Sequence, residues 1–234
     1  MNTATVTALT PRASAKLHAA CSDCSLAHLC LPMGLCRTDL QRMDSLVTRS
    51  APVHEGEHLF RVGDTFKAIY AVRAGCYKTY TVDSEGREHV LGFHLPGELL
   101  GLDAIFHGRH MCNAVALDTA TVCMLPYAEL TELSGEIEGL RTQLFRLMSK
   151  DIGGASTLAG DFTAEERIGA FLLDLARRLH QRGFSQSEFN LAMSRRDIAN
   201  YLRLAPETVS RVFARFEKER LIRVERRNMH LADP

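Results

Sequence analysis

Apolar residues follow two different spacings along the chain. From about residue 51, short apolar runs such as HLFRVGD, AIYAVRAG and YKTYTV alternate with turns that contain glycine. Short strands separated by turn signals about every 8–12 residues are typical of antiparallel β structures. The spacing therefore predicts an antiparallel β sandwich or roll over residues 51–133, with the tip of a hairpin at the DSEG sequence of residues 83–86.

From residue 134, apolar residues recur every three or four positions, which is the spacing of one face of a helix. We expect a long helix over residues 134–162, which either packs onto the β domain or pairs with the same helix of a second chain. Gly153 and Gly154 lie inside it, and each costs about 1 kcal/mol relative to alanine in a helix interior. The apolar stripe, and hence the expected dimerisation surface, consists of Ile137, Leu140, Leu144, Met148, Ile152 and Ala155.

Residues 163–234 have the pattern of a small helical domain. The TAEE sequence of residues 163–166 has the spacing of a capping box, in which the Thr and Glu side chains bond free N–H groups of the first helical turn. Two further helical patterns follow, with Ser194 as the cap of the first and Pro206 in the first turn of the second. The small Ala199 fits the closest approach of two helices that cross steeply, so this segment predicts a helix-turn-helix.

The second helix of this motif has the residue types that read DNA bases. Its expected outward residues are Glu207, Ser210, Arg211 and Arg215. Arginine bonds guanine, glutamate accepts from the cytosine amino group, and serine bonds several bases. The following LIRVERRNMHL sequence predicts a hairpin wing, with Arg226 and Arg227 at its tip in position for phosphates. Double-stranded DNA is the partner that this combination predicts.

The charge distribution agrees with a DNA-binding role for the C-terminal third. The whole chain has 28 basic and 28 acidic residues, so its formal net charge is zero. Residues 163–234 hold 14 Lys and Arg against 10 Asp and Glu (+4), whereas residues 1–162 hold 14 against 18 (−4). A local basic surplus favours a polyanionic partner.

The sequence predicts neither a membrane span nor an export signal. It has no run of about 18 apolar residues, and the first residues lack the apolar core of a signal peptide. We therefore expect a cytoplasmic protein with no membrane partner. Residues 1–20 carry no periodicity and are interpreted as a flexible arm.

Three cysteines near the start of the chain have the spacing of a metal site. Cys21, Cys24 and Cys30 follow the pattern C-x2-C-x5-C within a cysteine-rich segment, residues 21–50. An odd total of seven cysteines in a reducing compartment favours metal binding or redox chemistry over disulfides. A zinc site usually adds a second close pair of ligands, which is absent here in clean form. An iron–sulfur cluster needs only a fourth thiolate, and spacing alone favours Cys36.

Other candidate metal or catalytic residues carry weaker signals. Cys76 and Cys112 have no metal-site spacing, and we expect them to be small apolar core residues. His28 lies within the cysteine segment, and His107 and His110 belong to an HGRH sequence that is typical of an exposed turn. No acidic pair, phosphate loop, nucleophile elbow or dinucleotide fingerprint occurs, so we do not expect an enzyme.

The succession of β roll, long helix and winged helix-turn-helix resembles the CRP/FNR family of bacterial transcription regulators. ETVSR at residues 207–211 is similar to the recognition sequence of the FNR/ANR branch. The resemblance runs from about Cys21 to the end of the chain, and it is also specific in GFHLPGEL, RLMS, RGFS and LAMSR. The resemblance implies an α+β fold and a homodimeric regulator whose Glu, Ser and Arg contact TTGAT-type half-sites of a palindromic operator. It also implies that RNA polymerase contacts the hairpin of residues 83–86.

The same resemblance changes the expected set of metal ligands. In FNR-like proteins the fourth ligand matches Cys123, within TVCMLPYAEL, rather than Cys36. The resemblance implies one [4Fe–4S] cluster per subunit on Cys21, Cys24, Cys30 and Cys123, whose loss in oxygen weakens the dimer and so controls anaerobic genes. Three alternatives stay open: a cluster-free regulator that responds to a nucleotide or another small effector, an iron–sulfur electron-transfer protein or enzyme, and a structural zinc site.

Several positions depart from the patterns of the family. Nucleotide-binding relatives have Arg followed by Ser or Thr after the turn that GELLG forms here, whereas this chain has Cys112 and Asn113, so we expect a vestigial nucleotide pocket. Arg203 stands in the interhelical turn where glycine is usual, and it costs about 1 kcal/mol if it adopts a positive φ. Ala155 replaces an acidic residue of the dimerisation helix, which predicts a stronger dimer and weaker oxygen sensitivity.

Overall fold

The computed structural model describes residues 20–156, 162–232 and 234 of the chain. Its helices are η1 (Ala27–Leu29), α1 (Arg37–Leu46), η2 (Leu102–Ala104), α2 (Tyr127–Glu136), α3 (Glu138–Ser156), α4 (Ala164–His180), α5 (Arg195–Tyr201) and α6 (Pro206–Lys218). Its strands are β1 (Thr48–Arg49), β2 (His58–Phe60), β3 (Ala68–Ala74), β4 (Tyr77–Val82), β5 (Glu88–His94), β6 (Leu99–Leu100), β7 (Asn113–Ala116), β8 (Thr121–Pro126), β9 (Glu188–Asn190), β10 (Ile222–Glu225) and β11 (Asn228–Leu231).

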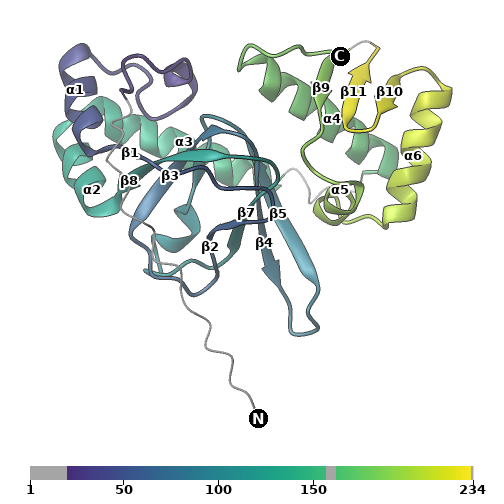
Figure 1. Cartoon of the computed structure of the whole chain (residues 1–234), viewed down its shortest axis with the longest axis horizontal. Helices are drawn as coiled ribbons and strands as arrows, with labels where there is room; N and C mark the ends of the chain where they lie inside the picture. Colours follow the sequence, from purple (N-terminus) through teal and green to yellow (C-terminus); the bar gives the residue numbers. More distant parts are fainter. Residues whose placement is uncertain (1–19, 157–161, 233) are drawn as a thin grey trace.

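The chain forms a central β region with helices on both sides (Figure 1). Helices α1 and α2 lie at one end of the β region, and the C-terminal domain of α4, α5, α6 and the last three strands lies on the other side. The expected flexible arm lies outside the described residues, apart from Ala20. None of the helices in the described ranges is long and apolar enough to cross a bilayer.

Two four-stranded antiparallel sheets form the β roll, as the sequence predicts. Their strand orders are β1-β8-β3-β6 and β2-β7-β4-β5. Val72, Tyr77 and Val122 fill the space between the sheets and are at most 1% exposed. The expected hairpin tip joins β4 to β5, where the N–H of Gly86 donates to the Asp83 carbonyl (3.0 Å) and Gly86 adopts a φ of 77°.

The helical region after the β roll consists of two helices rather than the single one expected over residues 134–162. Ile137 separates α2 from α3 because its backbone is extended (φ −108°, ψ 100°). The break places Ile137 and Leu140 in the core of the protomer, where they are 5% and 0% exposed. The end of the expected helix, residues 157–161, lies outside the described residues.

The C-terminal domain has the elements that its sequence predicts. Thr163 and Glu166 form the capping box at the start of α4, and Ser194 caps α5 through a reciprocal bond with Asp197. Pro206 is the first residue of α6. The buried faces of the three helices pack on the sheet β10-β11-β9 and form a winged helix-turn-helix. The α+β fold class is thereby confirmed.

Arg203 forms the turn between α5 and α6 with a φ of 57°, in the left-handed region. Its N–H donates to the Asn200 carbonyl (3.1 Å), and the N–H of Leu204 donates to the Ala199 carbonyl (2.9 Å). These bonds close the turn in the manner of a helix C-cap. The positive φ on which the expected strain depends is therefore present at Arg203, where a residue other than glycine costs about 1–2 kcal/mol.

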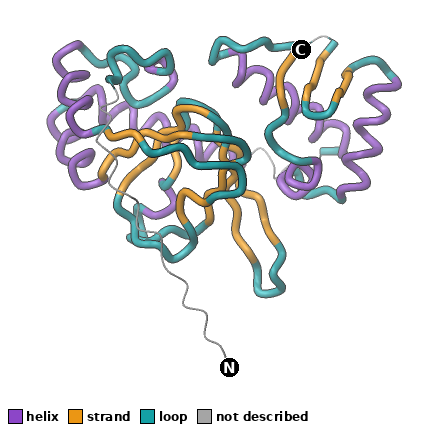
Figure 2. Tube along the Cα trace, viewed as in Figure 1, coloured by secondary structure: helices purple, strands orange, loops and turns teal. Residues whose placement is uncertain are grey.

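The β roll and the C-terminal domain share one apolar cluster. The ring of Phe93 in β5 packs edge-to-face on Phe171 of α4 and Tyr201 of α5, with centroids 6.0 and 5.2 Å apart. The side-chain amide of Asn200 donates to the Glu88 carbonyl at the start of β5 (2.5 Å). Helix α5 therefore docks on β5, one strand of the long hairpin that projects from the β region (Figure 2).

Candidate metal centre and nucleic-acid interface

The cysteine segment folds as a compact loop against the β roll. A turn joins Cys21 to Cys24, because the N–H of Cys24 donates to the Cys21 carbonyl (3.2 Å). Leu31 anchors the loop in the core and is 0% exposed. Gly97 has a φ of 90°, and a Cβ added to it would lie 3.1 Å from the Cβ of Leu29. The loop thus makes its close approach to the β roll over a glycine.

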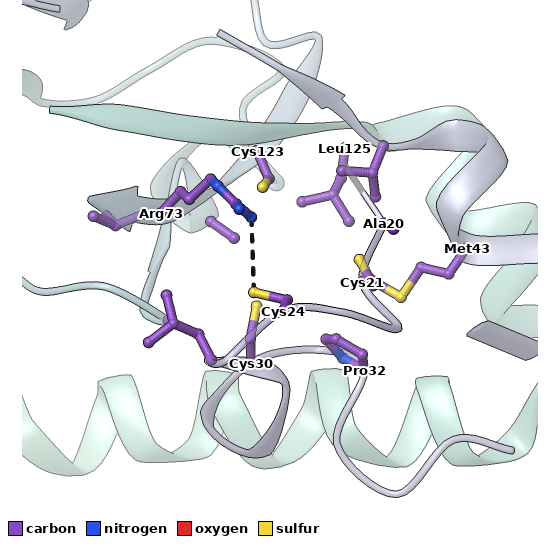
Figure 3. Close-up of a pocket in the computed structure, with 14 residues that line it drawn as sticks. Ala20, Cys21, Cys24, Cys30, Pro32, Met43, Arg73, Cys123 and Leu125 are labelled. Carbon is purple, nitrogen blue, oxygen red and sulfur yellow. Dashed lines mark hydrogen bonds between the residues drawn. The ribbon is translucent and has the colours of Figure 1, made fainter. Parts of the chain in front are cut away.

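One pocket brings cysteines from two distant parts of the chain together (Figure 3). The thiols that line it are those of Cys21, Cys24, Cys30 and Cys123. Cys123 comes from β8, where its register partners are Arg49 of β1 and Ala71 of β3. In Figure 3 the loop cysteines and the strand cysteine face the same space from opposite sides. The structure therefore brings together all four residues that the family resemblance indicates as ligands.

Cys36 does not line this pocket. It is exposed at the N-cap of α1, and its Sγ lies 3.0 Å from the Thr38 hydroxyl. The fourth thiol of the pocket is thus Cys123, which spacing along the sequence does not indicate.

Burial raises the pKa values of three pocket thiols, those of Cys21, Cys30 and Cys123. Desolvation raises the pKa of Cys30 to about 12 and raises that of Cys21 still further. Burial also raises the pKa of Cys123, an effect that the nearby Arg73 guanidinium partly offsets. Metals bind thiolates, so a metal that enters this pocket must displace these protons.

The donor atoms of the side chains limit which groups fit the pocket. Among the described residues that line it, the potential ligands are four thiols and the thioether of Met43, with no carboxylate or imidazole. Iron–sulfur clusters and zinc sites with four cysteine ligands both take such a set. In the described ranges, no three Cys, His, Asp or Glu side chains form a group that could hold a single metal ion. The donor chemistry of the pocket is thus compatible with either group.

The remaining histidines and cysteines lie outside the pocket. His28 Nε2 donates to a backbone carbonyl just after α4 (3.0 Å), and His107 is exposed. His110 is 1% exposed and stacks on an aromatic ring with centroids 3.7 Å apart, so the expectation of an exposed turn is wrong for this residue. Cys76 and Cys112 are 2% and 4% exposed, which confirms their expected core positions.

The outer face of α6 carries the polar residues that the sequence assigns to it. Glu207, Ser210, Arg211 and Arg215 are all exposed. An Arg211 guanidinium nitrogen donates to the Thr208 hydroxyl (3.2 Å), within the same helix. Arg215 forms ion pairs with Glu165 (2.5 Å) and Glu219 (2.9 Å). The first turns of the helix therefore offer Glu207 and Arg211, whereas Arg215 is partly neutralised.

The β10–β11 hairpin forms the expected wing, with Arg226 and Arg227 in its turn. Arg226 has a φ of 59° and is exposed. Arg227 forms an ion pair with Glu55 of the β roll (2.9 Å). In this arrangement Arg226 is the better placed of the two for a phosphate.

Two protein-family models match the chain. Residues 51–136 match the Cyclic nucleotide-binding domain, and residues 166–234 match the Crp-like helix-turn-helix domain. The first match covers the β roll from β2 to α2, and the second covers most of α4 and everything after it.

Curated relatives match most of the chain. The transcriptional activator protein anr of Pseudomonas aeruginosa is 47% identical over 216 residues, which are 91% of this chain and 88% of that protein. The fumarate and nitrate reduction regulatory protein of Escherichia coli (strain K12) is 45% identical over 208 residues, which are 88% of this chain and 83% of that protein. The chain belongs to the FNR/ANR branch of the CRP/FNR family.

A solved structure supports the same membership. FixK2 from Bradyrhizobium japonicum superposes with a TM-score of 0.72 at 28% identity, covering 80% of this chain and 93% of that chain. The curated relatives at 45–47% identity are transcription regulators. This member of the FNR/ANR branch is accordingly a DNA-binding transcription regulator and not an enzyme.

In this FNR/ANR-branch regulator a carboxylate, that of Asp103, lies just after the GELLG sequence, where the sequence predicts a vestigial nucleotide pocket. Asp103 accepts the N–H groups of Met111 (2.7 Å) and Cys112 (3.3 Å), and it also accepts the Cys112 thiol (3.4 Å). Arg109 is turned to the Gly63 carbonyl (2.9 Å). The turn is thus internally satisfied, and its negative charge disfavours a phosphate.

Part of the expected dimerisation surface faces inward. Ile137 and Leu140 are buried, and Leu144 is half-buried against the same core cluster. In this protomer Ile137 and Leu140 offer no surface to a second chain, so the structure does not support their place in a dimer interface.

The outward face of α3 carries a different apolar row. Phe145 is 62% exposed and Ile152 is 70% exposed, with Met148 half-buried between them along the helix. The stripe expected from the sequence omits Phe145, although spacings of three and four residues through 145, 148 and 152 are typical of a coiled-coil seam. The side chain of Ala155 lies outside the described ones.

Proposed function

We propose that this protein is an oxygen-responsive transcription regulator whose [4Fe–4S] cluster controls dimerisation and DNA binding. The proposed cluster ligands are Cys21, Cys24, Cys30 and Cys123. The observation that carries the proposal is the convergence of these thiols, from a terminal loop and a central strand, on one apolar pocket. The relatives named as an activator and as a fumarate and nitrate reduction regulator support control of anaerobic genes, by activation or repression.

The ligand set would connect two parts of the chain. When bound, a [4Fe–4S] cluster supplies a centre that reacts with oxygen. Three ligands belong to the loop of residues 21–30 and one to β8, so shared coordination fixes the loop to the sheet. Because binding energy at such a site stabilises the ordered form, the order of the loop depends on occupancy.

The loop also supports the helix that carries the proposed dimer surface. The buried Gln143 side chain of α3 donates to the Cys30 carbonyl (3.3 Å). A Cβ on Gly139 would lie 3.2 Å from Leu35, so the segment runs close along α3. An ordered loop therefore stabilises one face of α3 while the other face presents Phe145 to a partner. By linkage, whatever stabilises this form of the protomer also favours the homodimer.

A dimer would place two copies of α6 in successive major grooves of a palindrome, about one helical turn apart. The proposed base contacts to a TTGAT-type half-site come from Glu207, Ser210 and Arg211 in the first turns of α6. Arg215 lies further along the same face, and Arg226 of the wing is placed for a phosphate.

RNA polymerase is the second proposed partner, at the tip of the β4–β5 hairpin. The side chain of Asp83 holds this tip in shape by accepting from Arg87 (2.8 Å) and His89 (3.0 Å). A regulator that acts at promoters works in the cytoplasm, where reducing conditions also keep the thiols available as ligands.

Anaerobic purification with iron and acid-labile sulfide analysis tests the proposal. We expect both elements in the protein, and loss of both together with loss of dimers and operator binding after exposure to air. Zinc without sulfide would establish a structural site instead. Protein that binds its operator identically with and without iron would overturn the proposed control.

Two cysteine variants test the ligand set directly. Cys123→Ser is expected to abolish cluster binding, whereas the matched variant Cys36→Ser, at an exposed thiol outside the pocket, is expected to retain it. A full cluster in Cys123→Ser would refute the assignment of the fourth ligand.

A further inference from the structure

Arg73 is the one charged residue among the described residues that line the thiol pocket. One of its guanidinium nitrogens, Nη1, lies 3.8 Å from the Sγ of Cys24 (Figure 3). Two other largely buried arginines, Arg178 and Arg182, pair with the carboxylate of Glu98. The hydrogen bond that the Arg73 side chain makes in the described structure goes to a sulfur instead.

Arg73 lies on the face of β3 that points to this pocket, because it follows Ala71, the register partner of Cys123, by two residues. In the pairing of β3 with β8, Val72 is opposite Val122 and Ala74 is opposite Thr121, so Arg73 is an extra residue between two consecutive partners. The position of the guanidinium is thus built into the backbone of the sheet that also carries Cys123.

A second arginine lies on the other side of Cys123. Arg49 of β1 is the register partner of Cys123, which puts both side chains on one face of the sheet. The Nε of Arg49 is buried and has no hydrogen-bond partner among the described residues. Cys123 therefore lies between two cationic side chains, of which Arg73 lines the pocket.

The proposed centre carries a net negative charge that the two arginines can offset. Four thiolates carry more negative charge than the iron–sulfur core carries positive charge, so the bound group is an anion. The Asp44 carboxylate accepts the N–H of Cys21, which adds negative charge beside the loop. In an apolar pocket, a buried charge is costly unless it is paired.

We infer that Arg73 is a positioning residue for the cluster, which donates to the Cys24 sulfur and offsets the charge of the ligand set. The inference rests on the proposed function, because it concerns the group held by the four thiols. Hydrogen bonds to ligand sulfurs, and positive charges beside them, stabilise an anionic cluster and raise its reduction potential. Arg73 thereby sets how firmly the protein retains iron, independently of the DNA-binding surface.

Rates of iron release test this inference without any measurement of DNA binding. The full-length wild type and the variants Arg73→Gln, Arg73→Lys and Arg61→Gln are reconstituted without oxygen, and transfer of iron to a chelator is followed anaerobically. Arg61 is an exposed arginine of the same domain that does not line the pocket, so its variant matches the change in charge. Midpoint potentials are measured on the same samples.

We expect Arg73→Gln to release iron about tenfold faster or more, the size of effect that loss of a charge-assisted hydrogen bond produces. Its midpoint potential should become more negative, since an electron is then added to a less compensated anion. Arg73→Lys should recover part of both effects because it keeps the charge, and Arg61→Gln should match the wild type.

Release rates and potentials of Arg73→Gln equal to those of the wild type would overturn the inference while leaving the proposed function intact. A wild type that takes up no iron and sulfide would refute the proposed function itself. Thermal unfolding of the cluster-free variants identifies a general loss of stability. If Arg73→Gln unfolds at a lower temperature than the wild type, Arg73→Lys is the informative variant. The proposed role predicts that it recovers part of the iron retention and of the midpoint potential.

Discussion

Glu98 and Arg178 form a salt bridge (2.5 Å) that joins the β roll to helix α4. Arg182 adds a second bridge to Glu98 (2.8 Å), and the three side chains are 16%, 17% and 1% exposed in the order Glu98, Arg178, Arg182. Burial raises the pKa of Glu98, but the two guanidinium groups lower it more strongly, so the resulting pKa is about 2. The contact between the two domains is therefore held by charge as well as by the Phe93 cluster.

Replacement of Glu98 by glutamine leaves two buried guanidinium groups without their shared carboxylate. We expect the free energy of unfolding to fall by about 3 kcal/mol, as when one partner of a buried ion pair is removed. Urea unfolding of the cluster-free protein near neutral pH measures this change. The exposed Glu129→Gln serves as control and should alter stability by less than about 0.5 kcal/mol. Equal stabilities of the two variants would show that the bridge contributes little.

The same salt bridge predicts a window of acid sensitivity. Because folding lowers the pKa of Glu98 from 4.5 to about 2, the unfolded chain binds more protons in this interval. The contribution of Glu98 to stability is therefore complete above pH 4.5 and is lost as the pH falls toward about 2. The stability difference between wild type and Glu98→Gln should shrink over this interval. A difference that does not change with pH there would contradict the assignment.

Arg203→Gly is expected to stabilise the protein by about 1 kcal/mol, because glycine adopts the left-handed conformation without the Cβ clash. Chemical unfolding measures the change. Arg196→Gly, at an exposed position inside α5, makes the same substitution in helical backbone and should destabilise by about 1 kcal/mol. A loss of stability in both variants would mean that the Arg203 side chain contributes more than its backbone costs.

Phe145→Ala and Leu140→Ala separate the dimer surface from the core. Phe145 is exposed and Leu140 is buried in the same helix, so the first variant should weaken the dimer and leave the monomer stable. Leu140→Ala should lower the free energy of unfolding by about 2–5 kcal/mol. Anaerobic sedimentation gives the dimer content, and urea unfolding of the cluster-free monomer gives the stability. Undiminished dimers in Phe145→Ala would place the interface elsewhere.

Arg211→Ala is expected to cost about 1–3 kcal/mol on the preferred operator and to relax the preference at one position of the half-site. Arg226→Ala should instead weaken binding to all sequences similarly and reduce its salt dependence, since a phosphate contact carries no sequence information. Binding titrations on operators with single substitutions, at several salt concentrations, distinguish the two. A uniform loss in Arg211→Ala would assign that residue to the backbone of the DNA.

Local signals made the DNA-binding domain predictable. The capping residues Thr163 and Ser194, the first-turn Pro206 and the strained Arg203 each act within a few residues of their position. The break at Ile137 has no such signal, because the apolar spacing of three and four residues continues across it. For the same reason, the apolar stripe expected from the sequence includes residues of α3 that face the core and residues that face outward.

The thiol pocket was predictable only in part. Three of its thiols are close in sequence, but the fourth is brought near by the pairing of β8 with β1 and β3, which spacing does not encode. The family resemblance supplied Cys123 where the spacing favoured Cys36. Arg73 gives no signal in the sequence, because its contact with Cys24 joins β3 to a loop 49 residues earlier in the chain.

Gly97 and Glu98 are consecutive residues with different neighbours. Gly97 lies under Leu29 of the cysteine loop, and Glu98 holds the two arginines of the helix that leads into the DNA-binding domain. A single peptide bond therefore separates the contact with the cysteine loop from the salt bridges that hold α4 of the DNA-binding domain. The cysteine loop and helix α4 of one subunit therefore rest on the same short turn, without any contribution from a second subunit.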